Sequence, residues 1–486
     1  MSAAIVWFRR DQRLADNPAL AAALESHDQV LPVYIDAPDE EAPWQPGAAS
    51  RWWLHHSLKA LDGDLRKRGA ALHVCRGATL KTLRALIRKC DASAVYWNRL
   101  YEPALVARDA RIKDALRGDG IDAKSFNAAL LFEPWDIATG QHTPYKVFTP
   151  FWRNARARLA LRAPSRAPRR IAMPRVDIGL DVETLGLLPA IAWDSAIAKR
   201  WTPGEAGAHM ALDRFLDAHV GDYAERRDFP GERGTSRLSP HLHFGEISPM
   251  QIAVALESAS HGSAKRRAGG EAWLRELGWR EFSHHLLYHF PESADRNLDP
   301  DFDAFRWARL SPARLRRWQQ GRTGIPIVDA GMRELWASGW MHNRVRMLVA
   351  SFLTKNLRQH WLVGARWFWD TLVDADLANN TQGWQWTAGS GADASPYFRI
   401  FNPVTQGRRF DADGAYVRRW VPELAAFDGA AIHQPWKDPA QMRAAGYPKP
   451  MVDLDASREA ALAAYRACKA PPGPHVAHEK RRKKSR

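Results

Sequence analysis

The sequence predicts two domains of different class: an α/β domain with a doubly wound parallel sheet, followed by an all-α domain. Two observations support this. Short apolar runs alternate with amphipathic helical stretches over roughly the first 135 residues. From Gly204 to about Ala467, by contrast, one helical pattern follows another and strand-like alternation is nearly absent.

The predicted strands are four short, largely apolar runs at residues 4–8, 29–35, 71–75 and 94–97. Amphipathic stretches lie between them, for example Ser50 to Lys67 and Thr79 to Lys89. Strands and helices at this spacing form βαβ units, in which ligands usually bind at the carboxyl ends of the strands. The chain has no Gly-x-Gly-x-x-Gly and no Gly-Lys-Ser/Thr phosphate loop, which disfavours a dehydrogenase or a P-loop enzyme.

A long linker is predicted between the two domains, because residues 160–200 are rich in Pro, Arg and Ala and have weak periodicity. In the helical domain, Ser239-Pro240 and Ser248-Pro249 mark helix starts with proline near the first position. The predicted boundaries are 1–135 for the α/β domain, 136–203 for the linker, 204–470 for the helical domain and 471–486 for a basic disordered tail.

The chain is strongly basic. Its 486 residues include 70 Lys and Arg against 54 Asp and Glu, a formal net charge of +16. This balance favours a polyanionic partner, nucleic acid ahead of an anionic membrane; the alternative is a surface biased towards arginine for solubility. The three cysteines show no metal or disulfide spacing, and no apolar run approaches the length of a membrane span. With no leader pattern at the start, we expect a cytoplasmic protein without a metal site.

The stretch from Gly339 to Pro403 concentrates tryptophans, amides and unpaired acids in a largely helical run. Asp374 and Asp376 stand two residues apart, shortly before Asn380. Buried carboxylates and amides need partners, so one interpretation is a polar organic ligand. A helix terminus that faces water is the alternative.

A second polar cluster runs from Gly234 to Ser239. It combines hydroxyl groups, backbone amides and Arg237 at a predicted helix start. Such a start suits a phosphate, because unpaired amides and the positive end of the helix dipole both face an anion. The hexamer taken alone is better explained by an ordinary N-cap.

These motifs resemble those of the photolyase/cryptochrome flavoprotein family. The resemblance extends from Val6-Trp7-Phe8-Arg9-Arg10-Asp11-Gln12-Arg13-Leu14 to Phe401-Asn402-Pro403. It implies an α/β antenna domain, a linker and a helical flavin domain, in the order derived above. It also implies FAD as cofactor, light as energy source and DNA that contains cyclobutane pyrimidine dimers as substrate.

By resemblance, the Gly234–Ser239 cluster holds the FAD diphosphate, Arg346 and Asp374 pair beside the flavin ring, and Asn380 faces flavin N5. The implied FAD residues are Tyr223, Thr235, Ser236, Arg237, Leu238, Ser239, Trp273, Arg280, Asn343, Arg346, Asp374, Asp376 and Asn380. The implied catalytic residues are Glu276, Asn343 and Asn380, with Trp384, Trp361 and Trp307 as an electron relay from the flavin to the surface.

A flipped-out dimer needs aromatic walls, which Trp279 and Trp386 supply, and partners for its carbonyl and imide edges, which Glu276 and Asn343 supply. Arginines near the DNA backbone neutralise phosphates. The implied substrate and DNA residues are Arg227, Glu276, Trp279, Arg280, Asn343, Arg344, Met347, Trp386 and Arg399.

Within the family, Met341-His342-Asn343 followed by Met347 is similar to the pattern of cyclobutane dimer enzymes, whereas (6-4) photolyases carry a histidine in the substrate pocket. Plant-type cryptochromes carry Asp where this chain has Asn380. The chain is therefore most similar to a class I-type photolyase, a light-driven carbon–carbon lyase, or to a related cryptochrome-like bacterial one. A blue-light photoreceptor without repair activity and a (6-4) photolyase are the alternatives.

The antenna chromophore is less closely specified. Methenyltetrahydrofolate is the first choice because it is the family's commonest antenna, yet Ala104-Leu105 stand where folate-binding members often carry Asn-Glu. The Ser50–Leu54 run looks more like cryptochromes, and Asn380-Thr381-Gln382-Gly383 replaces the usual Asn-Asn-Gly-Gly. We expect a monomer with no membrane partner.

Overall fold

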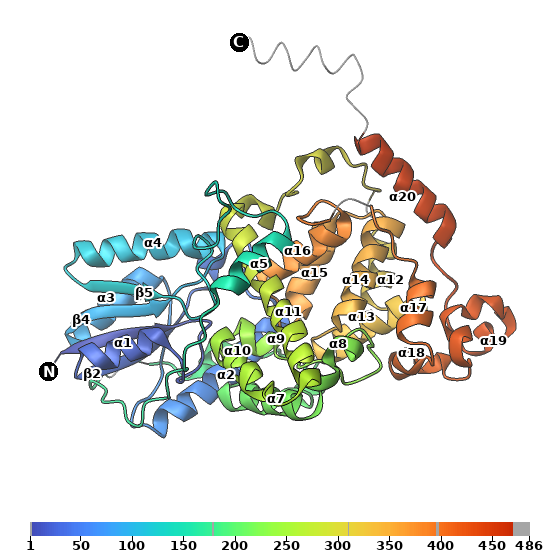
Figure 1. Cartoon of the computed structure of the whole chain (residues 1–486). Helices are drawn as coiled ribbons and strands as arrows, with labels where there is room; N and C mark the ends of the chain where they lie inside the picture. The colour runs from blue at the N-terminus through green and yellow to red at the C-terminus, as the bar shows by residue number, and fades with distance from the viewer. Residues whose placement is uncertain (1, 177–178, 310, 395–397, 470–486) are drawn as a thin grey trace, which may run out of the picture.

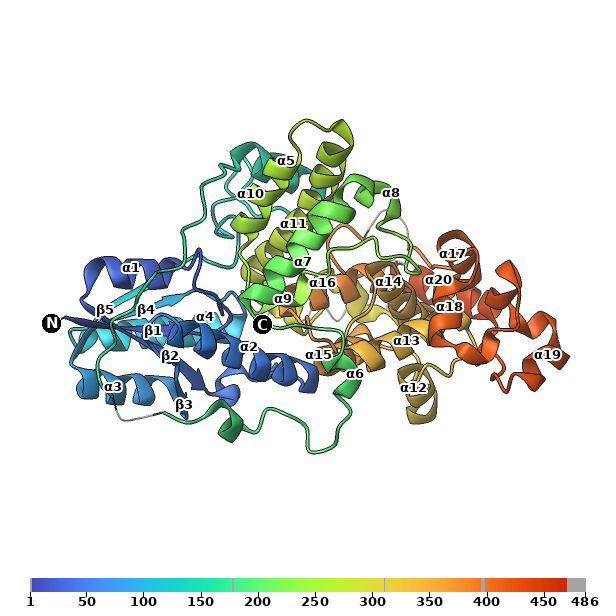
Figure 2. The ribbon, with the colours of Figure 1, turned by 90° about the horizontal axis from the view of Figure 1, so that it is seen from below.

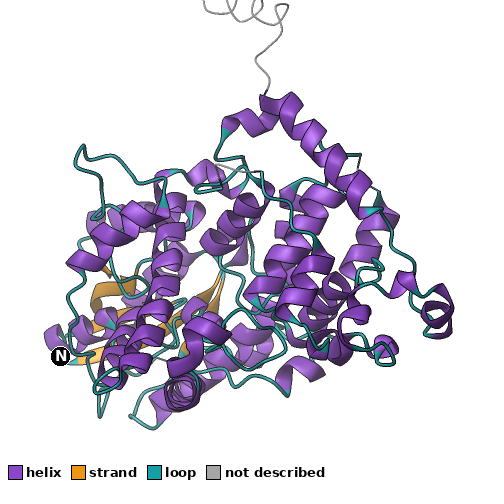
Figure 3. Ribbon diagram, turned by 45° about the vertical axis from the view of Figure 1, so that its right-hand side comes forward, coloured by secondary structure: helices purple, strands orange, loops and turns teal. Residues whose placement is uncertain are grey.

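The computed structural model describes residues 2–176, 179–309, 311–394 and 398–469, so the predicted tail at 471–486 lies outside the described residues. Strands are confined to one end of the molecule and helices build the rest (Figures 1 and 3). The α/β part therefore comes first in the chain and the helical part second, as predicted.

One parallel sheet has the strand order β3-β2-β1-β4-β5. The four predicted strands are confirmed, and the fifth was missed because its Asp-Ala-Lys-Ser-Phe sequence is polar and lies at the sheet edge. The strands are β1 (Ala3–Phe8), β2 (Gln29–Asp36), β3 (His73–Arg76), β4 (Ala92–Asn98) and β5 (Asp122–Phe126).

Helices cover both faces of this sheet, whose edge is seen between α1 and α3 in Figure 2. Side chains alternate along a strand, so Ala4 and Val6 of β1 pack with α1 and α2, whereas Ile5 and Trp7 pack with α3 and α4. The helices are α1 (Pro18–Ser26), α2 (Ala48–Arg66), α3 (Thr79–Cys90) and α4 (Pro103–Gly118), with a 3-10 turn η1 (Pro38–Glu41).

The segment predicted as a linker, 136–203, contains α5 (Phe148–Arg158) and the short turns η2 (Val182–Leu185) and α6 (Ser195–Ala198). Helix α5 packs against α11 (Ala264–His289). The rest runs back along the sheet, where the amide of Ile171 donates to the carbonyl of Arg68 over 2.8 Å. Part of the predicted linker is therefore a helix that packs on the second part of the molecule, while the domain boundaries stay a prediction.

The second part is helical, and the described residues of 204–469 contain no strand. Its helices, besides α11, are α7 (Glu205–Ala218), α8 (Tyr223–Arg226), α9 (Ser239–His243), α10 (Pro249–Ala259), α12 (Pro312–Gln319), α13 (Pro326–Ser338), α14 (Asn343–Ser351), α15 (Trp361–Thr371), α16 (Leu377–Ala388), α17 (Pro403–Phe410), α18 (Ala415–Trp420), α19 (Pro439–Ala444) and α20 (Leu454–Lys469). Short turns are η3 (Val220–Asp222), η4 (Pro291–Ala294), η5 (Pro300–Ala304), η7 (Pro422–Leu424), η8 (Gly429–His433) and η9 (Pro435–Lys437), and a π-helical turn η6 (Phe352–Asn356) continues α14.

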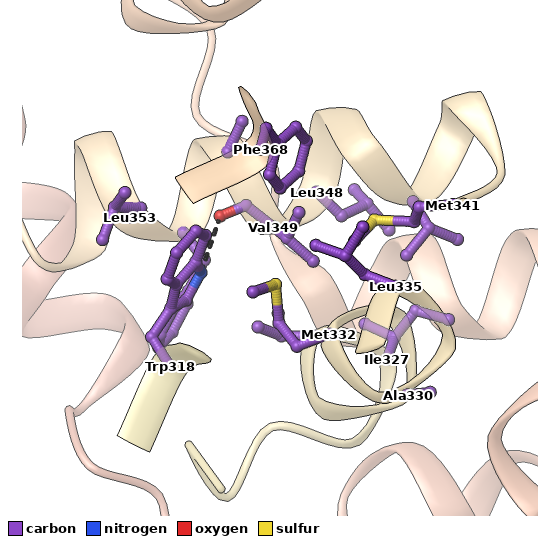
Figure 4. Packing of buried hydrophobic residues seen from close by; sticks show 14 of the residues in the cluster. Trp318, Ile327, Ala330, Met332, Leu335, Met341, Leu348, Val349, Leu353 and Phe368 are labelled. Atoms are coloured by element: carbon purple, nitrogen blue, oxygen red, sulfur yellow. Dashed lines mark hydrogen bonds between the residues drawn. The ribbon is translucent and has the colours of Figure 1, made fainter. Parts of the chain in front are cut away.

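A hydrophobic core holds these helices in place. Trp318 of α12 is fully buried, and its indole nitrogen donates to the carbonyl of Val349 over 3.2 Å (Figure 4). Met332, Leu335 and Phe368 belong to the same cluster. Each such apolar side chain contributes about 1.5–3 kcal/mol on burial, so α12 to α16 form a rigid support for the site beside them.

Buried hydrogen bonds join the two parts of the molecule. The guanidinium of Arg13, in the loop after β1, donates to the carbonyl of Gly245 over 2.9 Å. The indole nitrogen of Trp53 donates to Glu246 over 2.9 Å, and the hydroxyl of Ser248 donates to Asp16 over 2.6 Å. Because buried polar groups are costly to leave unpaired, these contacts hold the α/β part against α9 and α10 in one orientation.

Candidate cofactor and substrate cavity

A cavity of about 590 Å³ opens among α8, α9, α11, α14 and α16. Its volume is that of a site for a sizeable organic ligand. Twenty of the sequence-predicted residues line it: Tyr223, Arg227, Thr235, Ser236, Arg237, Leu238, Ser239, Trp273, Glu276, Trp279, Arg280, Asn343, Arg344, Arg346, Met347, Asp374, Asp376, Asn380, Trp384 and Trp386. Trp361, Trp307 and Arg399 lie outside the lining.

One wall is a face of the long helix α11. Its start is capped by Ser263, whose hydroxyl accepts from the amide of Arg266. Trp273, Glu276 and Arg280 follow at helical spacing and therefore point the same way. Behind them Gly278 packs so tightly on Trp152 that a Cβ atom would overlap the indole ring, which fixes the distance between α11 and α5.

The opposite wall is made by the first turns of two helices. His342 caps α14, its Nδ1 accepting from the amide of Arg344 over 3.2 Å. Asp376 caps α16, its carboxylate accepting from the amide of Asn379 over 2.8 Å. The caps decide which residues begin each helix, and so turn Asn343 and Asn380 towards the cavity.

The predicted ion pair is present. The guanidinium of Arg346 reaches both carboxylate oxygens of Asp374, at 2.8 and 3.1 Å, and also donates to the carbonyl of Met341 over 2.7 Å. Asp374 is buried, with a side-chain exposure of 3%. A forked, buried pair of this kind gives the cavity wall fixed geometry and little net charge.

Asp376 is the second buried acid. Its Oδ2 lies 3.4 Å from Nε2 of His284 and 3.8 Å from Nδ1 of His243. Burial alone raises the pKa of Asp376, but His284 and the contact with His243 outweigh it and hold that pKa well below its usual range. The cavity therefore presents Asp376 as a carboxylate.

Asn380 points one end of its amide into the protein. Its Nδ2 donates to the carbonyl of Ala365 over 2.9 Å. This bond identifies the oxygen as the end left for a ligand in the cavity. An acceptor at this place suits a ring N–H group.

The cluster from Gly234 to Ser239 forms the irregular loop that leads into the first residue of α9, with a positive φ of 55° at Arg237. The hydroxyls of Ser236 and Ser239 accept from the indole nitrogens of Trp273 and Trp340, over 3.1 and 3.2 Å. Arg237 stacks on Trp340 at 4.9 Å, and no acid pairs with it among the ion pairs of the described residues. A half-buried arginine without an acid suits an anionic ligand such as a diphosphate.

Several buried polar atoms on the cavity wall have no partner within the described part of the chain: Nδ1 of His243, Oε1 of Gln382 and Nε1 of Trp384. Unpaired buried polar atoms are costly. Donors and acceptors beside aromatic rings and a free arginine together fit a large polar, aromatic and phosphorylated ligand.

At the mouth of the cavity, Trp279 stacks on Phe148 of α5, with ring centroids 3.6 Å apart and planes 9° apart. Phe148 is buried and so supports one side of the indole. Trp279 itself lines the cavity and offers an aromatic wall to a planar ligand.

Two further ion pairs lie at this mouth. Arg227 pairs with Glu276 of α11 over 2.5 Å, and Arg344 of α14 pairs with Asp228 over 2.7 Å. The neighbours Arg227 and Asp228 thus reach opposite walls. All four side chains keep 19–37% of their surface exposed.

The predicted relay leads away from the cavity. Trp384 is buried under Phe368, and a Cβ atom at Gly364 would overlap its indole ring. Trp361 is also buried, whereas Trp307 is half-buried. His360 lies between these two, with ring centroids 5.6 Å from Trp361 and 5.1 Å from Trp307.

Sequence reasoning missed Asp228, His243, His284 and Phe148. His284 follows Arg280 by four residues on the same helix, so helical spacing could have found it. Phe148 belongs to the segment predicted as linker, where the helical spacing of Phe148, Phe151 and Ala155 was overlooked. Arg399 is on the exposed stretch before α17, and its contact with DNA stays a prediction.

Comparison with known proteins identifies the family of this chain. Residues 4–169 match the family described as DNA photolyase, and residues 273–467 match the FAD binding domain of DNA photolyase. A deoxyribodipyrimidine photo-lyase of Agrobacterium fabrum is 47% identical over 96% of this chain and 98% of its own length. The chain belongs to the photolyase/cryptochrome family.

Other members are similar at lower identity. Cryptochrome-1 of Arabidopsis thaliana is 39% identical over 93% of this chain and 69% of its own length. A solved bacterial class III photolyase from Agrobacterium tumefaciens has a TM-score of 0.92 at 47% identity, covering 96% of this chain and 98% of that one. An archaeal photolyase from Sulfolobus tokodaii with two FAD molecules has a TM-score of 0.82 at 31% identity, covering 96% and 99%.

Family membership confirms FAD as the cofactor, and the polar, aromatic cavity in the helical part fits it. The identity of the second chromophore stays a prediction. A small cavity of about 50 Å³ lies at the carboxyl ends of the strands, lined among others by Trp7, Arg10 and Trp369. None of the helices in the described ranges is long and apolar enough to cross a membrane.

Proposed function

We propose that this protein uses light to split cyclobutane pyrimidine dimers in DNA. The observation that supports this best is the shared cavity: residues implied to bind FAD and residues implied to bind the dimer line one space of about 590 Å³. A flipped-out dimer that entered past Trp279 would meet FAD without a protein layer between them. Relatives named deoxyribodipyrimidine photo-lyase point to the same reaction.

The residues of the cavity then have separate roles in binding FAD. The Gly234–Ser239 cluster, with Arg237, takes the diphosphate of FAD, and Arg346 with Asp374 borders its ring system. Asn380 offers its amide oxygen to a ring N–H group. When bound and reduced, FAD supplies the light-excited electron that opens the cyclobutane ring and is then recovered, so the reaction has no net redox change.

The mouth binds the substrate. Trp279, supported from behind by Phe148, stacks on the extruded bases, with Trp386 as the second aromatic wall. Glu276 and Asn343 pair with the polar edges of the dimer. In the free protein Glu276 is held by Arg227 over 2.5 Å, so binding exchanges this contact for contacts to the dimer and to a phosphate.

Two other members of the family remain as alternative assignments. A cryptochrome-like photoreceptor without repair activity is consistent with the 39% identity to a plant cryptochrome. Asn380, and the substrate residues other than Arg399 gathered in one cavity, favour repair. Met347, rather than a histidine, on the wall near Asn343 favours the cyclobutane dimer over the (6-4) product.

One experiment separates the three. The purified, pre-reduced protein is incubated with DNA that carries a single cyclobutane dimer or a single (6-4) product, in darkness and under blue light. We expect light-dependent loss of the cyclobutane dimer alone. Repair of the (6-4) product would favour the (6-4) enzyme, and retained FAD without repair of either lesion would favour the photoreceptor.

A further inference from the structure

Two neighbouring histidines on α11 have opposite surroundings, although both are buried. His285 contacts one acceptor and one donor: its Nδ1 faces the carbonyl of Pro134 at 2.9 Å, and its Nε2 accepts from the amide of Tyr145 over 3.0 Å. One ring nitrogen must carry a proton and the other must not, so His285 is neutral. Burial accordingly lowers the pKa of His285 to about 4.

His284 contacts two acceptors instead. Its Nδ1 lies 3.0 Å from the carbonyl of Arg280, which can only accept, and its Nε2 lies 3.4 Å from the carboxylate of Asp376. The first contact requires a proton on Nδ1, and a second proton on Nε2 would face the carboxylate, so these surroundings favour an imidazolium. Burial works against this charge, but Asp376 beside it raises the pKa of His284 overall.

The position of His284 decides what this charge acts on. The ring does not line the FAD cavity; it stands behind Asp376, which does. The other oxygen of Asp376 accepts from both the amide and the side chain of Asn379, each over 2.8 Å. Asp376 is thus clamped from two sides. His284, behind it, is within ion-pair distance, and Arg280 on the cavity wall adds positive charge without forming an ion pair with it.

We propose that His284 is a charged positioning residue, which holds Asp376 as a carboxylate aimed into the FAD cavity and raises the reduction potential of bound FAD. Reduction to the anionic flavin adds negative charge beside a wall that already contains Asp374 and Asp376. Arg346 compensates the first acid. His284 compensates the second, and without it an unbalanced carboxylate would oppose the extra electrons.

The charges around His284 are consistent with this assignment. The start of α4 brings Glu102, which pairs with Arg10, and the ring of Tyr101 lies 6.3 Å from that of His284. On α9, His243 faces the same carboxylate at 3.8 Å, but burial lowers its pKa, so it is the neutral neighbour. The charged partner of Asp376 is therefore His284.

Three variants test the effect on FAD. His284→Gln keeps a donor towards Asp376 but removes the charge, and His284→Arg keeps the charge. His285→Gln is the matched control, because it removes the neighbouring buried histidine without touching Asp376. We expect the midpoint potential of bound FAD to shift to a more negative value in His284→Gln, to stay near that of the unaltered protein in His284→Arg, and to stay unchanged in His285→Gln.

A second measurement needs no cofactor. In the ¹⁵N spectrum of the histidine rings at pH 8, where an ordinary histidine is neutral, the signals lost in His284→Arg should have the shifts of an imidazolium. Signals of a neutral ring would overturn the proposal, as would an unshifted potential in a His284→Gln protein that retains FAD. The inference rests on FAD occupying this cavity, which is part of the proposed function. Failure to bind FAD would contradict that function, while the ring signals would still decide the charge of His284.

Discussion

The cavity has an inner region, here called the floor, that contains Asp374, Asp376 and Arg346, and a mouth that contains Trp279, Asp228 and Arg344. Each region has an Arg–Asp ion pair, but the two acids lie at different depths. On the floor, Asp374 pairs with Arg346, and the exposure of the acid is 3%. At the mouth, Asp228 pairs with Arg344, and the exposures are 37% and 19%. The shortest distances are 2.8 and 2.7 Å, and the two arginines are about equally exposed, at 24% for Arg346 and 19% for Arg344. The pairs therefore differ mainly in the depth of the acid and in the second carboxylate oxygen that Arg346 reaches.

The burial of the acid decides how easily each ion pair can exchange its partner. Breaking a buried pair leaves an uncompensated charge in a poorly solvated place and costs several kcal/mol, so the floor pair is permanent. The acid at the mouth is partly exposed, and solvent weakens such a pair towards the about 0–1 kcal/mol of surface pairs, so a phosphate of DNA can take its place. The floor is thus organised to hold a cofactor, and the mouth to exchange partners.

The largest difference is expected when the acid of each pair is removed. Asp374→Ala should lower the free energy of unfolding by about 3 kcal/mol, the lower end for a buried pair because Arg346 keeps 24% of its surface exposed. It should also reduce the FAD content. Asp228→Ala, the matched change at the mouth, should cost less than about 1 kcal/mol and leave FAD in place. Urea unfolding and flavin absorbance measure both. Equal losses in the two variants would contradict the division into floor and mouth.

A smaller effect, confined to the mouth, is expected from Trp279→Ala. It removes a stacking surface and should weaken binding to DNA with a dimer by about 1–3 kcal/mol, with normal FAD content. Fluorescence anisotropy with damaged and undamaged duplexes measures the first, and flavin absorbance the second. Trp336→Ala, at a tryptophan that is 59% exposed on α13 and outside the cavity lining, is the control. Loss of FAD with unchanged affinity for damage would assign Trp279 to the floor.

The sequence predicted the floor better than its supports. Asp374, Asp376 and Asn380 stand out because unpaired polar residues crowd into an apolar helical stretch. The partners that complete them come from elsewhere in the chain: His284 lies 92 residues before Asp376, and Phe148 lies 131 residues before Trp279. Helical spacing places His284 on the same face as Arg280, but which residue that face meets depends on how α5, α11 and α16 pack, and the spacing does not give that.

In the fold as well, features that depend on contacts between elements were harder to predict than features of a single segment. The four apolar strands were predicted from composition alone, whereas the polar edge strand β5 owes its strand state to pairing with β4. Helix α5 was missed for another reason. Its buried Phe148, Phe151 and Ala155 lie at helical spacing, but the linker prediction, made from the composition of residues 160–200, was extended back over it. The edge strand was missed because its cause is tertiary, and α5 because its local pattern was overlooked.

A still smaller effect is expected from Arg344→Ala, which removes one phosphate contact from the mouth. Affinity for DNA should fall by about 1 kcal/mol near 0.1 M salt, and the slope of log affinity against log salt should lose about 0.9. Damaged and undamaged duplexes should lose equally, because a phosphate contact reads no base. A chain without residues 480–486 is the control for the basic tail. If the slope vanished with the tail and Arg344→Ala had no effect, the mouth would not be the DNA-binding surface.

The smallest effect is expected from Asp228→Asn, which keeps the shape of the side chain and removes its charge. Arg344 would no longer have to leave an acid before it meets a phosphate, and one like charge beside the DNA would be gone. Affinity for both duplexes should therefore rise, by less than about 1 kcal/mol because solvent reaches the acid. In the Asp228→Asn/Arg344→Ala double variant most of this gain should disappear, since the two side chains act on each other. A fall in affinity in the single variant would instead show that Asp228 orients Arg344 for the phosphate, and the mouth pair would then be as permanent as the pair on the floor.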